Sequence, residues 1–123
     1  MLSVLYDGKC SICRKEIEYY QKIAPPERFR WIDITTNTEV LADYHLKMSE
    51  VLFELHTVDS SGQMYKGVDS FILIWQELKY WRLLAKFASL PLIKPMLKRL
   101  YIVFAERRFK RLSHCQLSLQ NEP

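Results

Sequence analysis

The sequence predicts a single α/β domain built on a four-stranded mixed sheet. Three observations predict it: short segments of alternating hydrophobicity, segments of helical periodicity between them, and a length of 123 residues, which suits one domain. Hydrophobic residues make up 49% of the chain, enough to bury a core without disulfide staples.

The first part of the chain predicts a β-α-β unit. Residues 2–6 form an apolar segment that the turn signal Asp7-Gly8 ends. A helical stripe of Cys13, Ile17, Tyr20 and Ala24 follows, and Pro25-Pro26 ends it. We therefore expect a strand over 2–6, a helix from about Ser11, a strand over 29–34 and a short helix around 39–46.

The second part predicts a β-hairpin followed by helices. Alternation over 51–58 predicts a third strand, and Asp59-Ser60-Ser61-Gly62 predicts a turn into an antiparallel fourth strand over 63–66. Asp69 or Ser70 can cap a helix that runs to about Tyr80. A further helix over 81–90 precedes one with Pro95 in its first turn. Its apolar stripe, expected to pack on the core, is Ile93, Met96, Leu97, Leu100, Tyr101 and Phe104.

The resulting order is strand, helix, strand, helix, strand, strand, helix. The right-handed crossover rule makes the first unit parallel, and the whole order is that of a thioredoxin-like sheet with extra C-terminal helices. We expect residues 1–112 to form this domain and residues 113–123 to form a polar, frayed tail.

The sequence Cys10-Ser-Ile-Cys13 falls at the predicted start of the first helix. At this spacing two sulfurs can form a disulfide without strain, and free N–H groups with the positive helix end favour a thiolate at the first cysteine. We expect an exposed Cys10 to be the nucleophile. Cys13, on the buried stripe one turn further in, would resolve the mixed disulfide.

Neighbouring residues complete the candidate site. Asp7 can hold the turn or cap the helix, or it can accept a proton from the resolving cysteine, and we favour the turn or cap role over proton transfer. Gly8 is expected to supply a backbone shape closed to other residues. Lys9 adds positive charge, while Ser11 and Ile12 lie between the sulfurs and would tune the potential.

These residues resemble a known family. Tyr6-Asp-Gly-Lys-Cys-Ser-Ile-Cys13 is similar to the signature of the thiol-disulfide oxidoreductase DCC family, named for its Asp, Cys and Cys. The similarity continues from Val4 to about Arg108, through Trp31-Ile-Asp-Ile34, Leu55-His-Thr-Val-Asp59 and Tyr65-Lys-Gly-Val-Asp-Ser-Phe71. The resemblance implies a thioredoxin-like fold and thiol-disulfide activity carried by Asp7, Cys10 and Cys13. We expect no cofactor.

The resemblance implies further site residues, and the sequence differs from thioredoxins at one position that matters for the site. In related folds the loop after the hairpin lies near the dithiol, so Gly67 and Asp69 could line the site, although a strand end and a helix cap also explain them. Thioredoxins carry a cis-proline before the third strand, and Met48-Ser-Glu-Val51 has none. Substrate docking would therefore differ, and the site would be more open to metals.

The net charge of +4 is concentrated near the C-terminus. Lys94–Arg111 holds seven basic residues and one acid, Glu106, so this segment is +6 and the remainder −2. A solvated face is the simplest interpretation, and peripheral contact with an acidic membrane or an acidic protein is the functional one. We expect no nucleic-acid partner, because the run lacks interleaved exposed aromatics.

Two other functions stay open at this point. A metal-binding module would use Cys10 and Cys13 with two more ligands, and His114, Cys115, His45 and His56 are the candidates. A non-catalytic adaptor would dock through the basic C-terminal helix. We favour a redox dithiol acting on protein or small-molecule disulfides, and we assign no metal ligand.

The number of cysteines and the length of the apolar segments predict the cellular compartment of the protein. Three cysteines are too few for a disulfide scaffold, and Met1–Leu5 is too short for the apolar region of a secretory signal. No stretch reaches the roughly 18 apolar residues that a membrane span needs. The expected compartment is the reducing cytoplasm.

Overall fold

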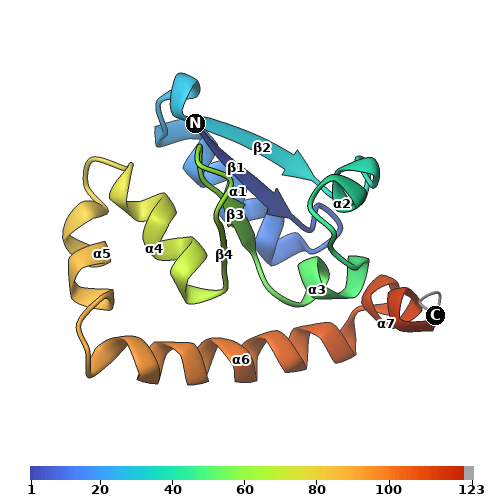
Figure 1. Cartoon of the computed structure of the whole chain (residues 1–123). Helices are drawn as coiled ribbons and strands as arrows, with labels where there is room; N and C mark the ends of the chain where they lie inside the picture. Colours follow the sequence, from blue (N-terminus) through green and yellow to red (C-terminus); the bar gives the residue numbers. More distant parts are fainter. Residues whose placement is uncertain (121–123) are drawn as a thin grey trace.

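In the computed structural model of the chain, the backbone is described for residues 1–120 and the side chains for residues 1–117. Figure 1 shows a central sheet with helices around it and the long helix α6 along one side. The elements are β1 (Leu2–Tyr6), α1 (Ser11–Ile23), a 3₁₀ turn (Pro26–Arg28), β2 (Phe29–Asp33), α2 (Glu39–Asp43), α3 (Met48–Phe53), β3 (His56–Val58), β4 (Met64–Lys66), α4 (Val68–Gln76), α5 (Arg82–Ala88), α6 (Ile93–Arg111) and α7 (Ser113–Gln120).

The sheet has the predicted topology. Its strand order is β2-β1-β3-β4, with β1 and β2 parallel and both other pairs antiparallel. The parallel pair needs a crossover, which α1 supplies, and the antiparallel β3–β4 pair closes through the predicted turn at Gly62, whose N–H donates to Asp59 O. The α/β, thioredoxin-like fold is confirmed.

Each face of the sheet carries its own core cluster. Val4 and Leu2 of β1 pack with Ile17 and Tyr20 of α1 and with Ile74 of α4. Neighbouring Leu5 points the other way, because side chains alternate along a strand, and packs in a second cluster. That cluster contains Val51 and Leu52 of α3, Phe109 of α6 and Cys115 of α7. The C-terminal helices therefore complete the core of the second face.

The predicted third strand over 51–58 is wrong in its first half. Residues Met48–Phe53 form α3, and β3 contains only His56–Val58. Val51 and Leu52 are buried against Phe109 and Cys115, which lie more than fifty residues further along the chain. The alternating hydrophobicity of residues 51–58 carries no information on such distant contacts. Here these contacts favour a helix over the strand that the pattern predicts.

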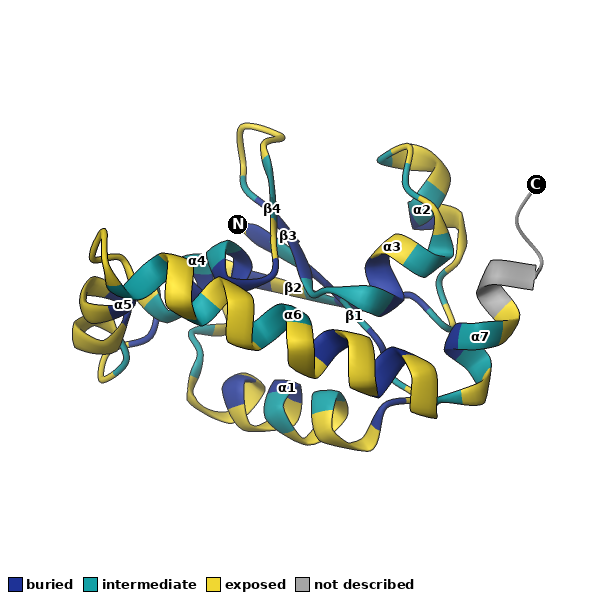
Figure 2. Ribbon diagram, turned by 90° about the horizontal axis from the view of Figure 1, so that it is seen from below, coloured by how far each residue is buried: buried dark blue, intermediate teal, exposed yellow. Residues whose placement is uncertain are grey.

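The apolar stripe expected on the last long helix packs only in part. Leu97 and Tyr101 lie partly buried against α4 and α5, whereas Met96, Leu100 and Phe104 are exposed. Figure 2 shows the mixed burial of α6, with buried positions interrupting an exposed helix. The inward row ends with Ala105, Arg108 and Phe109, so a basic residue takes a core position.

The predicted frayed tail begins with a packed helix. Ser113–Gln120 forms α7, which packs on α3 and the end of α6, and Cys115 is fully buried. Polar composition hid this helix, since Cys115 is the one residue among 113–117, whose side chains are described, that enters the core cluster. Residues 121–123 lie outside the described part of the chain. Within residues 1–120, no helix is long and apolar enough to cross a membrane.

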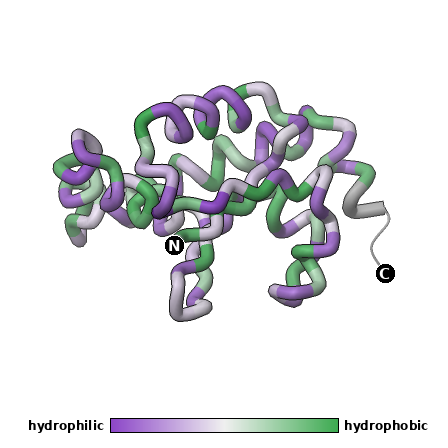
Figure 3. The backbone as a smooth tube through the Cα atoms, turned by 90° about the horizontal axis from the view of Figure 1, so that it is seen from above, coloured by the Kyte–Doolittle hydropathy of each residue, from purple (hydrophilic) through white to green (hydrophobic). Residues whose placement is uncertain are grey.

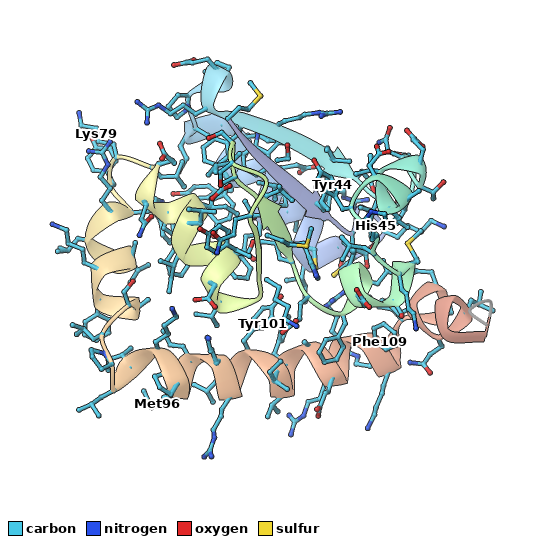
Figure 4. All side chains as sticks on the ribbon, viewed as in Figure 1. Tyr44, His45, Lys79, Met96, Tyr101 and Phe109 are labelled. Carbon is cyan, nitrogen blue, oxygen red and sulfur yellow. The ribbon has the colours of Figure 1, made fainter. Side chains whose placement is uncertain are left out.

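Tyr101 anchors the middle of α6 to the sheet domain. Its hydroxyl accepts a hydrogen bond of 3.1 Å from the backbone N–H of Leu55, and its ring contacts Phe71 edge-on. Figure 4 shows Tyr101 and Phe109 projecting from α6 toward the sheet. Burial raises the pKa of Tyr101 to about 12, so the hydroxyl stays protonated at neutral pH.

Removing the Tyr101 hydroxyl should destabilise the fold. Tyr101→Phe leaves the Leu55 N–H without its partner, which costs about 1–2 kcal/mol in the free energy of unfolding. Urea denaturation measures this change. Tyr19→Phe is the matched control, because Tyr19 is exposed and should change stability by less than about 0.5 kcal/mol. Equal stability of both variants would mean that the bond contributes nothing.

Candidate active site

Cys10 and Cys13 lie at the start of α1, where the sequence placed them. Cys10 is the N-cap residue, and its Sγ accepts a hydrogen bond of 3.4 Å from the backbone N–H of Cys13. The backbone of Cys10 is extended, and the helix begins at Ser11. All three cysteines lie in the described part of the chain, and none forms a disulfide. A thiolate at Cys10 would gain from this N–H donor and from the positive helix end.

The expected exposure of the two sulfurs is wrong. Cys10 is only 2% exposed, whereas Cys13 is half-buried and lines a pocket. The C-terminal helices bury Cys10, and the local sequence around the dithiol carries no signal of their position. Arg108 of α6 and Cys115 of α7 both lie close enough to act electrostatically on Cys10.

Asp7 joins the turn to those C-terminal helices. Its Oδ1 accepts a hydrogen bond of 3.0 Å from the N–H of Lys9, so Asp7 holds the turn before the dithiol. Its Oδ2 lies 3.4 Å from Nη1 of Arg108 and 2.8 Å from Nε2 of His114. The turn role is the one that the geometry shows, and the helix cap itself is Cys10.

Arg108 is a buried cation shared by several groups. Besides Asp7, its guanidinium donates hydrogen bonds to the backbone carbonyls of Leu52 and Phe53 at the end of α3. Burial alone lowers the pKa of Arg108, but the nearby sulfurs of Cys13, Cys10 and Cys115 outweigh it and raise that pKa. Arg108 therefore stays charged and stabilises negative charge on these sulfurs.

Gly8 is needed because of a close approach rather than an unusual φ, as its φ is not positive. A Cβ at this position would lie 1.8 Å from Oδ2 of Asp33. Asp33 Oδ1 accepts hydrogen bonds from the N–H groups of Gly8 and Thr35 and from the Thr35 hydroxyl. Asp33 thereby fixes the loop after β2 against the turn that carries the dithiol.

A small apolar pocket opens beside Cys13. About 40 Å³ is open to the centres of water molecules, which is room for very few of them. Its walls come from β1, α1, α3, α4 and α6 and from the segment before β3, with Ile12, Leu55, Phe71, Tyr101, Phe104 and Arg108 among them. Burial in this setting, together with the Cys10 hydrogen bond, raises the pKa of Cys13 well above its ordinary value.

The remaining predicted residues lie around this centre or apart from it. Lys9 and Ser11 are exposed, and Ile12 is 56% exposed at the rim of the pocket. Gly67 has φ +61° and lies against the Tyr101 ring, at the junction of β4 and α4. Asp69 pairs with Lys94 at 2.6 Å and Lys98 at 3.2 Å, so it ties α4 to α6 instead of facing the dithiol.

The sequence offered His114 and Cys115 only as candidate metal ligands for the dithiol, and the structure places both beside Asp7. Cys115 Sγ lies 4.0 Å from Asp7 Oδ2 and 3.8 Å from His114 Nε2. Burial, and then the charge of Asp7, raises the pKa of Cys115 to about 11. The available sequence signal was the adjacent His-Cys pair, which gave no hint of its distant partner. Arg108 was likewise counted only as part of a basic run.

The other two histidines lie elsewhere. His56 is buried on β3, where its Nδ1 lies 2.8 Å from the carbonyl oxygen of Glu54, and burial lowers its pKa. His45 is exposed and has φ +56°. Among the described residues, the group that could hold a metal ion is Asp7, His114 and Cys115, and it does not include the Cys10–Cys13 pair.

Comparison with known proteins identifies a family. The model of a family described as DCC1-like thiol-disulfide oxidoreductase matches residues 4–114. The chain belongs to this family. The matched range runs from β1 to α7 and so includes the dithiol, Asp7, Arg108 and His114.

Other comparisons add less. An uncharacterized chloroplastic protein of Arabidopsis thaliana is 27% identical over 79 residues, which is 63% of this chain and 37% of the plant protein. The matched part of this chain thus spans little more than a third of that relative. No solved structure matches the chain. The family supports a thiol-disulfide oxidoreductase activity in general, acting on thiols or disulfides.

Neutralising Asp7 should destabilise the protein strongly. Asp7→Asn leaves the Arg108 cation buried without its ionic partner, and breaking such a pair costs about 3–5 kcal/mol. Urea denaturation followed by circular dichroism measures the loss. Asp43→Asn, at an exposed position of α2, is the control and should change stability by less than about 0.5 kcal/mol. Wild-type stability of Asp7→Asn would show that the ion pair is not structural.

Proposed function

We propose that the protein reduces or exchanges disulfides in proteins or small molecules through the Cys10–Cys13 dithiol. The observation that carries the proposal is the hydrogen bond from the Cys13 N–H to Cys10 Sγ at the N-cap of α1. The charge of Arg108 adds to it, since Arg108 acts on both sulfurs from within the core. Both features stabilise a thiolate, which is the attacking species in disulfide exchange.

The proposed reaction has two steps. The Cys10 thiolate attacks one sulfur of the substrate disulfide, forms a mixed disulfide and releases the other sulfur as a thiolate. Cys13 then loses its proton and attacks Cys10 Sγ, which breaks the mixed disulfide and releases the second substrate thiolate. Two electrons pass to the substrate, and the dithiol becomes a disulfide. A cellular thiol must reduce that disulfide before the next cycle.

The order of the two cysteines follows from electrostatics. The raised pKa of Cys13 makes it a poor first attacker and suits a resolving thiol that ionises once Cys10 is consumed. Cys10 is buried, so a protein substrate reaches it only after local opening of the site. A role for Asp7 as proton acceptor stays a prediction, as does the cytoplasmic location.

Cysteine variants test both the activity and the order. Cys10→Ser should lower insulin disulfide reduction by about 100-fold or more, and Cys13→Ser should accumulate a mixed disulfide that mass spectrometry detects. Cys115→Ala is the control and should keep turnover if its folded fraction is preserved. A mixed disulfide that accumulates in Cys10→Ser instead would show that Cys13 attacks first and Cys10 resolves. Wild-type turnover by both dithiol variants would exclude the dithiol as the catalyst.

A metal centre is the second candidate, favoured by the cluster of Asp7, His114 and Cys115. One ligand atom from each lies within 4.8 Å of the others, and oxygen, nitrogen and sulfur donors all bind Zn²⁺. Arg108 opposes it, because its positive charge already pairs with Asp7. We therefore rank this candidate below the dithiol.

The metal content of protein purified without chelators tests this candidate. Zinc near one equivalent, lost in His114→Ala but kept in His45→Ala, would support a metal centre at Asp7. Metal-free protein that retains disulfide reductase activity would exclude such a centre from the mechanism.

A further inference from the structure

Helix α5 presents its apolar residues in an unusual way. Its inward positions are the small residues Ala85 and Ala88, each 1% exposed against Val68 and Ile72 of α4. A helix packed on a domain ordinarily turns its large apolar side chains inward. Here they point outward, and Leu83 is 79% and Phe87 55% exposed.

These exposed residues form one continuous surface. Tyr80, Leu83, Leu84, Phe87 and Leu90 line a single shallow depression together with Lys86. Tyr80 is 86% exposed at one end of α5, and Leu92, in the connection to α6, is 87% exposed at the other. We call Tyr80, Leu83, Leu84, Phe87 and Leu90 the α5 face. A contiguous apolar patch of this kind marks an interaction site on a soluble domain.

The charge around the α5 face has one sign. Lys79, Arg82 and Lys86 are all exposed on or beside the helix. The sequence holds no acidic residue between Glu77 and Glu106, although six basic residues lie in that interval. Figure 3 shows hydrophobic and hydrophilic segments interleaved around α5, at the left of the view. Apolar side chains that protrude among cations fit an anionic surface.

We propose that the α5 face binds the surface of an anionic lipid membrane, with the leucines and Phe87 inserted below the headgroups and Arg82 and Lys86 paired with lipid phosphates. A second copy of the chain fits less well, because a symmetric contact would bring the basic groups of both copies together. A protein partner would need a recess for the protruding side chains, whereas a bilayer admits them without a preformed site.

The basic residues of α6 are less suited to this role than the sequence suggested. Lys94 and Lys98 pair with Asp69, and Arg108 is buried with Asp7. The exposed cations Lys110 and Arg111 lie at the far end of α6, beside α7 and away from α5 (Figure 1). They therefore provide a matched test of whether charge alone, or charge combined with the α5 face, determines binding.

Vesicle co-sedimentation tests the proposal with the full chain. Vesicles of phosphatidylcholine and phosphatidylglycerol in a 3:1 ratio should bind the protein, and pure phosphatidylcholine should bind it at least about tenfold less. The double variants Leu83→Ser with Phe87→Ser and Arg82→Glu with Lys86→Glu should each lose about tenfold in binding. All four positions are exposed, and retained disulfide reductase activity or an unchanged circular dichroism spectrum confirms folding.

Controls come from the opposite end of the molecule. Leu117→Ser removes an exposed leucine on α7, and Lys110→Glu with Arg111→Glu reverses two cations on α6. Both should bind anionic vesicles like the wild type. Absent binding, equal binding to neutral vesicles, or loss in these controls only would overturn the proposal. So would a dimer in light scattering that the Leu83→Ser, Phe87→Ser variant abolishes without vesicles, since that result assigns the face to a second copy.

Discussion

The ion pair between Asp7 and Arg108 connects every part of the candidate site. It joins the end of β1 to α6 across 101 residues of sequence, and both side chains are nearly completely buried. The same guanidinium binds the carbonyls that end α3, and the same carboxylate holds the turn that leads to Cys10. A buried charge is tolerable only with such partners, so the turn, α3 and α6 must assemble together.

This arrangement makes α6 and α7 part of the domain that carries the dithiol. The minimal thioredoxin-like sheet supplies the dithiol, but Arg108 and Tyr101 of α6 fasten the segment from Leu52 to Leu55, which precedes β3. In thioredoxins a cis-proline occupies that place beside the dithiol, and this chain has none there. Side chains from an added helix shape this wall of the pocket instead, with Tyr101, Phe104 and Arg108 facing Cys13.

Electrostatics and access favour different sulfurs in this site. Cys10 lies at the N-terminus of α1 and accepts a hydrogen bond from an N–H group, which favours its thiolate. Cys13 instead lines the pocket beside the site, which gives it greater exposure. In the proposed mechanism, burial of Cys10 near the Arg108 cation protects its sulfur from adventitious oxidation, and a substrate must uncover it. The α5 face lies on elements that do not carry the dithiol, so the proposed membrane contact and the proposed disulfide exchange can be tested separately.

The sequence by itself determined the order of the elements, the sheet topology and the position of the dithiol, because these depend on local periodicity, turn residues and a short motif. It also identified Asp7 and Gly8 as residues of the turn that precedes the dithiol. Only the tertiary structure decided that Val51–Phe53 is helical, that Cys10 is buried, and that Arg108, His114 and Cys115 meet Asp7. Those features depend on contacts between residues more than 50 positions apart, and for Asp7 more than 100. The composition of a basic helix and a polar tail carries no signal of where these helices will dock.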